Sequence, residues 1–412
     1  MLELDVAPER PTLPDTASHA RFEVRIRADG PPLHRRVVLV LDRSSSMAGR
    51  SFVYARRLAA GLLALLPDGT EVTLVAFDAH ATLVLPPTSL DGSVRMRALH
   101  ALRALDVGHG TSFDAALGLG LGLAAPNGHL VLLTDGFPSY GATEVAPLTA
   151  QVLRRGATTL TTLGIGAGSH DLLLSCLARA GGGDAHFAED LGADDLAAGL
   201  GHELALVEDT VANEVDLVLH PATSVRLDKL WYRGPASREQ GARVIRLPRL
   251  VRGRPLSLAL QVAWESRNPE RLGLVELRAR DADGREHRRE AELAARYGRG
   301  PADPVALAGV LLTRLHCAVH DAAIDGSRAA PIWLATRIAE LRALADQEHL
   351  DAPELRRSFE LATRALQATG PRALARHLRA VERKSLAPIV RTRVHTAIAE
   401  LRHKSSIVPI DD

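Results

Sequence analysis

The chain has little cysteine, few aromatic residues and no excess of charge of either sign. Its two cysteines, Cys176 and Cys317, lie far apart, which excludes a disulfide framework and the close ligand spacing of a zinc site. Aromatic residues make up 3% of the chain, which argues against a base-stacking surface for single-stranded nucleic acid. The net charge is +1, so no overall field attracts nucleic acid or an anionic membrane.

Long apolar runs and targeting signals are also missing. No uncharged apolar run reaches the roughly 18 residues of a membrane-spanning helix, so we expect no membrane span. The first residues, MLELDVAPERPTLPD, are acidic and rich in proline and do not resemble a secretory signal. We therefore expect a cytoplasmic protein, whose 412 residues predict two or three domains at about 150 residues each.

Buried apolar runs alternate with helical periodicity in the first half of the chain. The runs VVLVLD (37–42), VTLVAF (72–77), HLVLLTD (129–135) and TTLTTLGIG (158–166) are typical of strands buried on both faces. Helices are expected between and after them, at 52–66, 91–104, 113–124, 145–154, 169–180 and 193–208. This alternation predicts an α/β domain at 35–209, built on a doubly wound, mostly parallel sheet.

Two further modules are expected after this domain. Successive strands separated by turns predict an antiparallel β-sandwich at 210–298. Its strands are expected at 215–220, 224–232, 243–250, 256–264 and 273–281. Within the N-terminal segment 1–34, an alternating strand at 20–29 is expected to join this sandwich.

Helical periodicity predicts a C-terminal helical bundle at 299–404, followed by a tail at 405–412. Asp303 with Pro304 forms an expected N-cap at its start. The helices are expected at 304–323, 329–346, 352–368, 371–385 and 388–403.

Oxygen-bearing side chains gather where predicted strands end and a predicted helix begins. Asp42, Ser44 and Ser46 form a D-x-S-x-S pattern after the first buried run, Thr111 precedes a helix, and Asp135 ends the third run. Ligands of open α/β sheets bind outside the carboxyl ends of the strands, and hard divalent cations prefer oxygen ligands. The five residues therefore predict a metal site. The alternative is that Ser44 or Ser46 only caps the helix near residue 51.

The runs DRSSSM, GTS and LLTDG resemble, in order and spacing, the metal-ion-dependent adhesion site (MIDAS) of von Willebrand factor type A (VWA) domains. The resemblance covers residues 36–208. It implies that Ser44, Ser46 and Thr111 ligate Mg²⁺ directly, with Mn²⁺ or Ca²⁺ as alternatives. It also implies that Asp42 and Asp135 bind the ion directly or through water.

A Mg²⁺ ion held mostly by hydroxyls is only partly neutralised, so an acidic side chain of a partner protein can complete its ligand shell. We therefore expect a non-enzymatic, Mg²⁺-dependent interaction protein. The resemblance to bacterial intracellular VWA proteins leaves a second reading, an adaptor of a MoxR-type AAA+ ATPase in complex assembly or metal insertion. A third reading is a metal-dependent phosphohydrolase with Asp78, His80, His109 or Asp114 as the base.

A basic stripe near the C-terminus is a separate candidate surface. Arg372, Arg376, Arg379 and Arg383 recur at helical spacing, which predicts that they share one helix face. An acidic or phosphate-bearing partner could bind this face, although a solvated face explains the stripe as well. Nucleic acid is not the expected partner.

Overall fold

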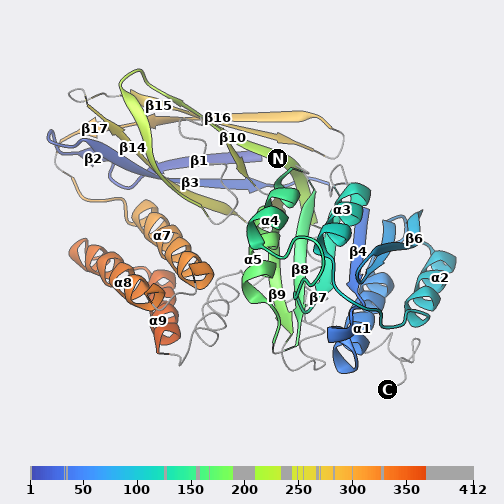
Figure 1. The fold of residues 1–412 in the computed structure, drawn as a ribbon. Helices are drawn as coiled ribbons and strands as arrows, with labels where there is room; N and C mark the ends of the chain where they lie inside the picture. Colours follow the sequence, from blue (N-terminus) through green and yellow to red (C-terminus); the bar gives the residue numbers. More distant parts are fainter. Residues whose placement is uncertain are drawn as a thin grey trace. The chain divides into compact units, whose positions relative to one another are not determined.

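A computed structural model gives the fold of the chain (Figure 1). The residues that the structure describes are 2–31, 33, 36–124, 128–154, 158–166, 168–188, 209–232, 244–247, 249–253, 255–265, 269, 271–281, 284–298, 300–325 and 329–367. They fall into two compact units. Within the described residues, one comprises Pro31–Glu214, and the other combines the strands up to Gly30 with residues 215–367, so the second unit is discontinuous in sequence.

The Pro31–Glu214 unit is built on a six-stranded sheet with the order β6-β5-β4-β7-β8-β9. Its strands are β4 (Arg36–Asp42), β5 (Glu71–Phe77), β6 (Ala81–Ser89), β7 (His129–Thr134), β8 (Thr159–Ile165) and β9 (Gly182–Ala188). Neighbouring strands are parallel except at one edge, where β6 pairs antiparallel with β5. The expected α/β fold is confirmed, with a mixed sheet in which the edge strand β6 was not predicted.

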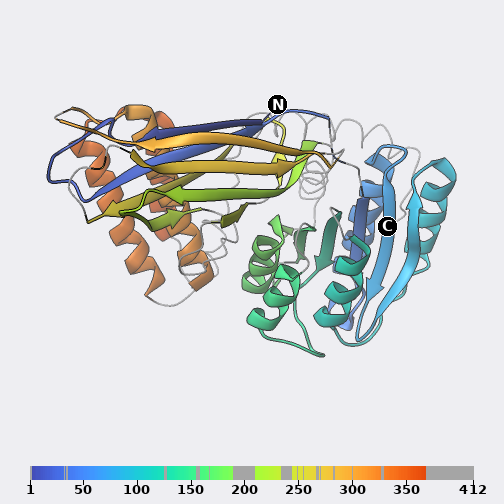
Figure 2. The ribbon, with the colours of Figure 1, turned by 90° about the horizontal axis from the view of Figure 1, so that it is seen from above.

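Helices cover both faces of this sheet (Figure 2). They are α1 (Arg50–Leu65), α2 (Gly92–Arg103), α3 (Phe113–Ala124), α4 (Val145–Leu153) and α5 (Asp171–Ala180). Leu39 and Leu41 of β4 pack with α1 and α2, whereas Val38 and Val40 pack with α3, α4 and α5. Both faces of the strand are therefore buried, which is why its sequence is continuously apolar.

The carboxyl ends of β4 and β7 lie at the switch point of this sheet. The two strands are neighbours, but the chain leaves β4 through α1 towards β5 and leaves β7 through α4 towards β8. The loops after β4 and β7 therefore diverge and leave room for a ligand between them. Asp42 ends β4 and Asp135 follows β7, which places both predicted acidic residues at this point.

The other unit contains two larger sheets, one with the order β1-β3-β14-β11 and one with the order β12-β10-β15-β16, where β13 also pairs with β10. Their strands are β1 (Leu2–Pro8), β3 (His19–Ala28), β10 (Thr210–Pro221), β11 (Val225–Trp231), β12 (Val244–Leu247), β13 (Leu250–Val251), β14 (Leu256–Trp264), β15 (Arg271–Arg280) and β16 (Glu286–Ala294). Short strands β2 (Thr12–Leu13) and β17 (Arg296–Tyr297) pair in parallel. The alternating segment at 20–29 is β3, which pairs antiparallel with β1 and with β14.

Helices α7 (Pro304–Asp325), α8 (Ala330–Gln347) and α9 (Pro353–Leu366) share one apolar core. Asp303 is the expected N-cap, because its Oδ1 accepts hydrogen bonds from the N–H groups of Val305 and Ala306. Helix α7 also packs against β3 and β14. Within the described part of the chain, no helix combines the length and apolar character needed to cross a membrane.

Some sequence expectations differ from the structure or fall outside it. The strand expected at 243–250 is two short strands, β12 and β13. The helices expected at 193–208, 371–385 and 388–403 and the tail at 405–412 lie outside the described residues. The same is true of the arginine stripe formed by Arg372, Arg376, Arg379 and Arg383.

Candidate metal centre

Asp42 is the buried carboxylate of the predicted site. Its side chain is 0% exposed. Its Oδ1 accepts a hydrogen bond from the Ser44 N–H at 2.8 Å, and its Oδ2 accepts one from the Thr134 hydroxyl at 2.5 Å. Thr134 ends β7, so the second bond joins the carboxyl ends of β4 and β7. The sequence did not identify Thr134 as part of the site, because its partner lies 92 positions away.

The two predicted serine ligands face each other in the loop after β4. The Oγ atoms of Ser44 and Ser46 are 3.0 Å apart, with Ser44 buried and Ser46 exposed. Ser44 stands at the N-cap of the short helix η1 (Ser45–Met47) without a side-chain cap bond, and Gly49 is the N-cap residue of α1. The alternative in which Ser44 or Ser46 caps the helix near residue 51, which is α1, is therefore wrong.

Thr111 lies on the α2–α3 loop, which is attached to both neighbouring loops. Its N–H donates to Oγ of Ser139 at 2.9 Å, and its carbonyl accepts from the N–H groups of Ser139 and Tyr140 at 2.9 and 3.1 Å. On the other side, the N–H of Gly108 donates to the carbonyl of Arg43 at 2.6 Å. These bonds tie the Thr111 loop to the loop carrying Ser44 and to the loop after Asp135.

Asp135 supplies the second acidic side chain and is 8% exposed. Its Oδ1 accepts a long hydrogen bond of 3.4 Å from the N–H of Phe137, and its carbonyl accepts one of 2.8 Å from the N–H of His170. The charge of Asp135 also raises the pKa of Asp42. The two carboxyl groups therefore interact electrostatically across the switch point.

Burial dominates the electrostatics of Asp42. Loss of water raises its pKa from 3.8 to about 7, although the hydrogen bonds from Thr134 and Ser44 act in the opposite direction. Among the described residues, no cationic side chain forms an ion pair with Asp42. A buried carboxylate without a counter-charge is unfavourable in its ionised form, and a bound cation would supply that charge.

The donors at this edge of the sheet fit a hard divalent cation. They are two carboxylates and three hydroxyls, with no nitrogen or sulfur ligand among them. Elsewhere in the described chain, too, no group of three or more His, Cys, Asp and Glu side chains is placed to hold a metal. The chemistry of the five oxygen donors therefore suits Mg²⁺ better than zinc.

Two of the residues considered as catalytic bases hold the surrounding loops. Asp78 accepts from Nη2 of Arg43 at 2.7 Å and from the N–H of His80 at 2.9 Å. Asp114 accepts from the N–H of Ala142 at 2.5 Å. These bonds give both carboxylates a positioning role. The Arg43–Asp78 pair was not predicted, because the two residues belong to different loops.

Part of the chain matches a known domain family. Residues 37–137 match the family model of the von Willebrand factor type A domain. An uncharacterized protein of Synechocystis is 28% identical over 185 residues. That match covers 43% of this chain and 43% of that protein, so the chain spans less than half of this relative.

Solved structures with low sequence identity share the fold. A von Willebrand factor type A protein from Catenulispora acidiphila has a TM-score of 0.70 at 16% identity, over 89% of each chain. The ArnB paralog VWA2 from Sulfolobus acidocaldarius has a TM-score of 0.61 at 12% identity, over 92% of this chain and 98% of that one. Human Sec24c, a COPII-coat protein, reaches 0.56 at 14% identity, over 88% of this chain and 58% of that one.

The family match falls within the Pro31–Glu214 unit. The matched residues 37–137 run from β4 through β7 and include all five predicted ligands. In this part of its sequence and in its fold, the chain contains a von Willebrand factor type A domain.

Proposed function

We propose that the protein binds a partner protein through a Mg²⁺ ion held by Asp42, Ser44, Ser46, Thr111 and Asp135. The observation that carries the proposal is the Asp42 carboxylate, which is fully buried and has no cationic partner among the described residues. Burying an ionised carboxylate costs several kcal/mol. A divalent cation next to Asp42 would offset that cost and keep the carboxylate ionised at neutral pH.

The hydrogen bonds between the loops support the same proposal. Gly108 bonds to the Ser44 loop through the Arg43 carbonyl, and Thr111 bonds to Ser139 in the loop after Asp135. A cation that takes ligands from three loops binds more tightly when those loops are already held together. The backbone bonds provide this arrangement without using the ligand hydroxyls of Ser46 and Thr111.

The proposed role of the metal is recognition. When bound, Mg²⁺ would supply a positive centre that accepts a carboxylate oxygen from outside. Of the four residues considered as bases, Asp78 and Asp114 have side chains that are engaged with the surrounding loops. The proposed non-enzymatic role predicts no turnover in a phosphatase screen with Mg²⁺ or Mn²⁺.

Calorimetric titration of Mg²⁺ into the full chain tests the proposal. Wild type is expected to give metal-dependent heat. Ser46→Ala is expected to weaken Mg²⁺ binding by roughly tenfold or more, because one oxygen ligand is lost. Ser45→Ala is the matched control, since Ser45 is an exposed serine in the same loop but is not a proposed ligand.

The protein interaction itself is tested by affinity purification with and without EDTA, followed by mass spectrometry. Partners are expected to bind in Mg²⁺, to be released by EDTA, and to be absent with the Ser46→Ala variant. The proposal is wrong if wild type gives no Mg²⁺ heat, or if Ser45→Ala and Ser46→Ala weaken Mg²⁺ binding equally.

A further inference from the structure

Exposed aromatic side chains lie in the loop that follows Asp135. Phe137 is 45% exposed and Tyr140 is 56% exposed. Of the aromatic side chains in the described residues, only Trp333 in α8 is comparably exposed, at 39%. Aromatics form just 3% of the chain and most of them are buried. Two exposed aromatics so close together therefore point to a binding surface.

Phe137 lies two residues after the proposed ligand Asp135 and forms a hydrogen bond to it. Its N–H donates to Oδ1 of Asp135 at 3.4 Å, so its side chain starts next to the carboxylate. Its ring lies 5.5 Å from the ring of His170, whose N–H donates to the Asp135 carbonyl. The phenyl ring is therefore held within about one side-chain length of the metal ligand.

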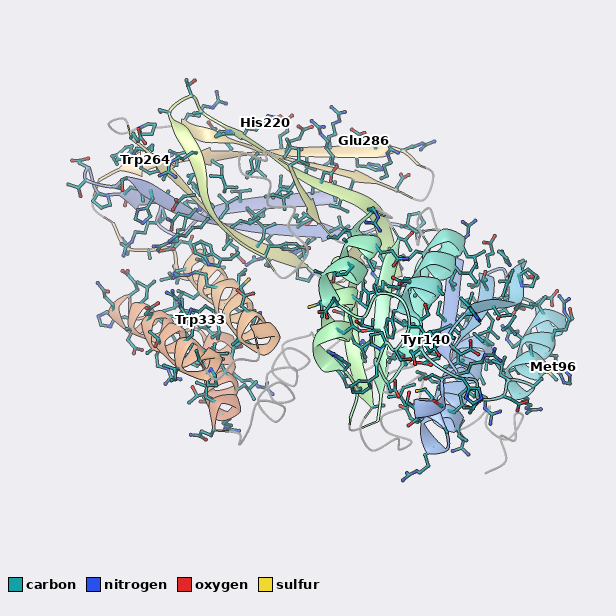
Figure 3. All side chains as sticks on the ribbon, viewed as in Figure 1. Met96, Tyr140, His220, Trp264, Glu286 and Trp333 are labelled. Atoms are coloured by element: carbon teal, nitrogen blue, oxygen red, sulfur yellow. The ribbon has the colours of Figure 1, made fainter. Side chains whose placement is uncertain are left out.

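Tyr140 is hydrogen-bonded through its backbone to the proposed ligand Thr111. Its N–H donates to the Thr111 carbonyl at 3.1 Å, and Ser112 and Tyr140 form an isolated parallel bridge. A Cβ added to Gly110 would lie 2.6 Å from Cδ2 of the Tyr140 ring, so the ring lies against the bare Cα of Gly110. The phenol ring, labelled in Figure 3, is thus held beside Thr111.

The two rings would add an apolar component to the recognition of an acidic partner. A bound Mg²⁺ would attract any accessible carboxylate, and charge alone would not distinguish one acidic partner from another. Exposed Tyr and Phe rings bury large apolar areas with little loss of conformational entropy, and tyrosine is enriched among the residues that dominate interface affinity. The rings would therefore select among acidic partners.

We propose that the partner is a protein segment in which an Asp or Glu is accompanied by a large apolar side chain two or three residues away. The acid completes the metal's ligand shell, and the apolar side chain packs on Phe137 and Tyr140. An extended segment advances about 3.3 Å per residue, so two or three residues cover roughly 7–10 Å, which suits rings attached directly beside the ligands. This inference rests on the proposed Mg²⁺-dependent binding.

A displayed peptide library tests the inference with the full chain. Seven-residue peptides with a fixed central Asp and random flanks are selected on the immobilised protein in Mg²⁺ and eluted with EDTA. The eluted peptides are expected to be enriched in aromatic or large aliphatic residues two or three positions from the Asp.

Matched variants separate this surface from the metal. The best enriched peptide is labelled, and its affinity is measured by fluorescence anisotropy. The double variant Phe137→Ser with Tyr140→Ser is expected to bind it at least tenfold more weakly, with unchanged Mg²⁺ affinity in calorimetry. Trp333→Ser removes an exposed aromatic in α8 instead and is expected to bind the peptide like wild type.

The outcomes distinguish the two proposals. Acidic peptides without apolar enrichment, or equal peptide binding by the double variant and wild type, overturn the role of Phe137 and Tyr140 and leave Mg²⁺-dependent binding standing. A library that gives no EDTA-sensitive binder overturns both. Equal losses in the double variant and in Trp333→Ser also overturn the inference, because the effect would then not be local.

Discussion

Nη2 of Arg43 lies 2.7 Å from Oδ2 of Asp78, and this ion pair joins the loop of the proposed serine ligands to the turn after β5. The backbone carbonyl of Asp78 also accepts from the N–H of Ser112 at 2.7 Å, next to Thr111. Asp78 therefore contacts two of the three loops that carry proposed ligands. A Cβ at Gly108 would meet the Asp78 carboxylate, so a glycine is needed where the loop passes this residue.

Asp78→Asn is expected to weaken Mg²⁺ binding by roughly three- to tenfold, because the arginine loses its charged partner and the ligand loop loses its anchor. Glu71→Gln is the matched control. It breaks the Arg36–Glu71 pair, which joins the same two strands at their opposite ends. Calorimetry should show wild-type Mg²⁺ affinity for Glu71→Gln, and similar losses in the two variants would contradict a positioning role for Asp78.

Asp42→Asn is expected to stabilise the metal-free protein at neutral pH. The folded state raises the pKa of Asp42 from 3.8 to about 7, so the unfolded chain releases this proton at lower pH than the folded one. Wild type therefore loses stability from this group as pH rises from about 4 to 7. The Tm of Asp42→Asn relative to wild type, measured in EDTA, should rise over this range by several °C and then level off.

Adding Mg²⁺ should raise the Tm of wild type above that of Asp42→Asn. An ion that binds only the folded state raises the Tm, and Asp42→Asn should bind Mg²⁺ more weakly because it lacks the carboxylate.

Asp91→Ala provides a control of opposite sign. Asp91 caps α2 through the N–H of Val94, and this bond lowers its pKa. Its stabilising effect is present above pH 3.8, so Asp91→Ala should melt below wild type there. An Asp42→Asn variant that melts below wild type in EDTA at pH 7 would refute the burial argument.

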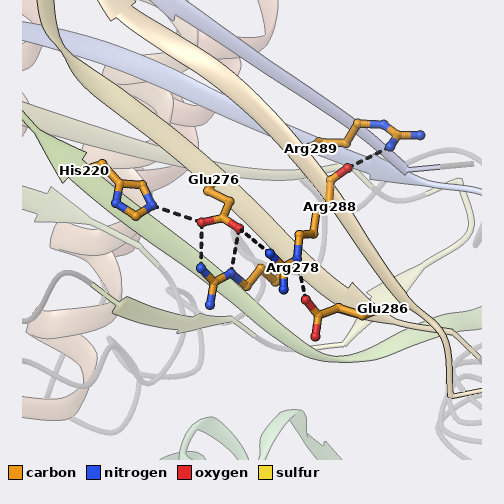
Figure 4. Close-up of polar contacts among 6 residues, drawn as sticks. All are labelled: His220, Glu276, Arg278, Glu286, Arg288 and Arg289. Atoms are coloured by element: carbon orange, nitrogen blue, oxygen red, sulfur yellow. Dashed lines mark hydrogen bonds and ion pairs between the residues drawn. The ribbon is translucent and has the colours of Figure 1, made fainter.

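Acid should selectively remove the stability contributed by Glu276 on β15. Its carboxylate accepts two hydrogen bonds of 2.7 Å from Arg278 and lies 3.0 Å from Nε2 of His220 (Figure 4). These bonds, chiefly that of Arg278, lower the pKa of Glu276 from 4.5 to about 2. The contribution is present above pH 4.5 and disappears as pH falls through about 2.

Thermal melts between pH 2 and pH 7 check this expectation. Glu276→Gln should melt below wild type at pH 7, and the difference should shrink between pH 4.5 and pH 2. Glu286→Gln serves as the control on the same sheet, since Glu286 bonds to Arg288 at 2.6 Å where both side chains are exposed. Exposed pairs contribute little, so this variant should stay close to wild type. A Glu276→Gln difference that is independent of pH would contradict the assignment.

The same substitution should have opposite effects at two helical glycines. Gly309 in α7 lies on Glu23 of β3, and an added Cβ would meet the Glu23 carboxyl group. Glu23 is buried and paired with Arg25, so its carboxyl group cannot swing into solvent without losing that pair. Gly309→Ala is therefore expected to destabilise the protein by about 1–3 kcal/mol through overpacking. Gly122 in α3 has open space around it, so Gly122→Ala should stabilise by roughly 0.5–1 kcal/mol through helix propensity. Urea unfolding measures both, and a stabilising Gly309→Ala would refute the close approach.

The sequence identified the parts of the fold that are buried on both sides. Strands such as β4 and β7 are continuously apolar because helices cover each face of the sheet. The edge strand β6 escaped prediction because Pro86 and Pro87 interrupt it, and prolines are tolerated only where a strand has a free edge. Strand β16 escaped because its sequence, EHRREAELA, is mostly charged and exposed.

In the candidate site, too, residues that are close in sequence were predicted and residues that depend on distant contacts were not. Asp42, Ser44 and Ser46 were recognised as candidate ligands because they occur in one short loop. Thr134 was not, because its role depends on a hydrogen bond to a strand distant in sequence. Phe137 and Tyr140 gave no periodic signal, since their importance comes from their exposure and from backbone bonds to Asp135 and Thr111.

The position of β3 between β1 and β14 has a consequence for biosynthesis. One edge of β3 pairs with β1 within the first 28 residues, but the other edge pairs with Leu256–Trp264. On the ribosome, this second edge stays open until more than 200 further residues have been made. The inserted Pro31–Glu214 unit has its complete sequence earlier, so it can fold before the sheet that surrounds it in sequence closes. Until then, the nascent hairpin of β1 and β3 presents an open strand edge that can pair with other chains.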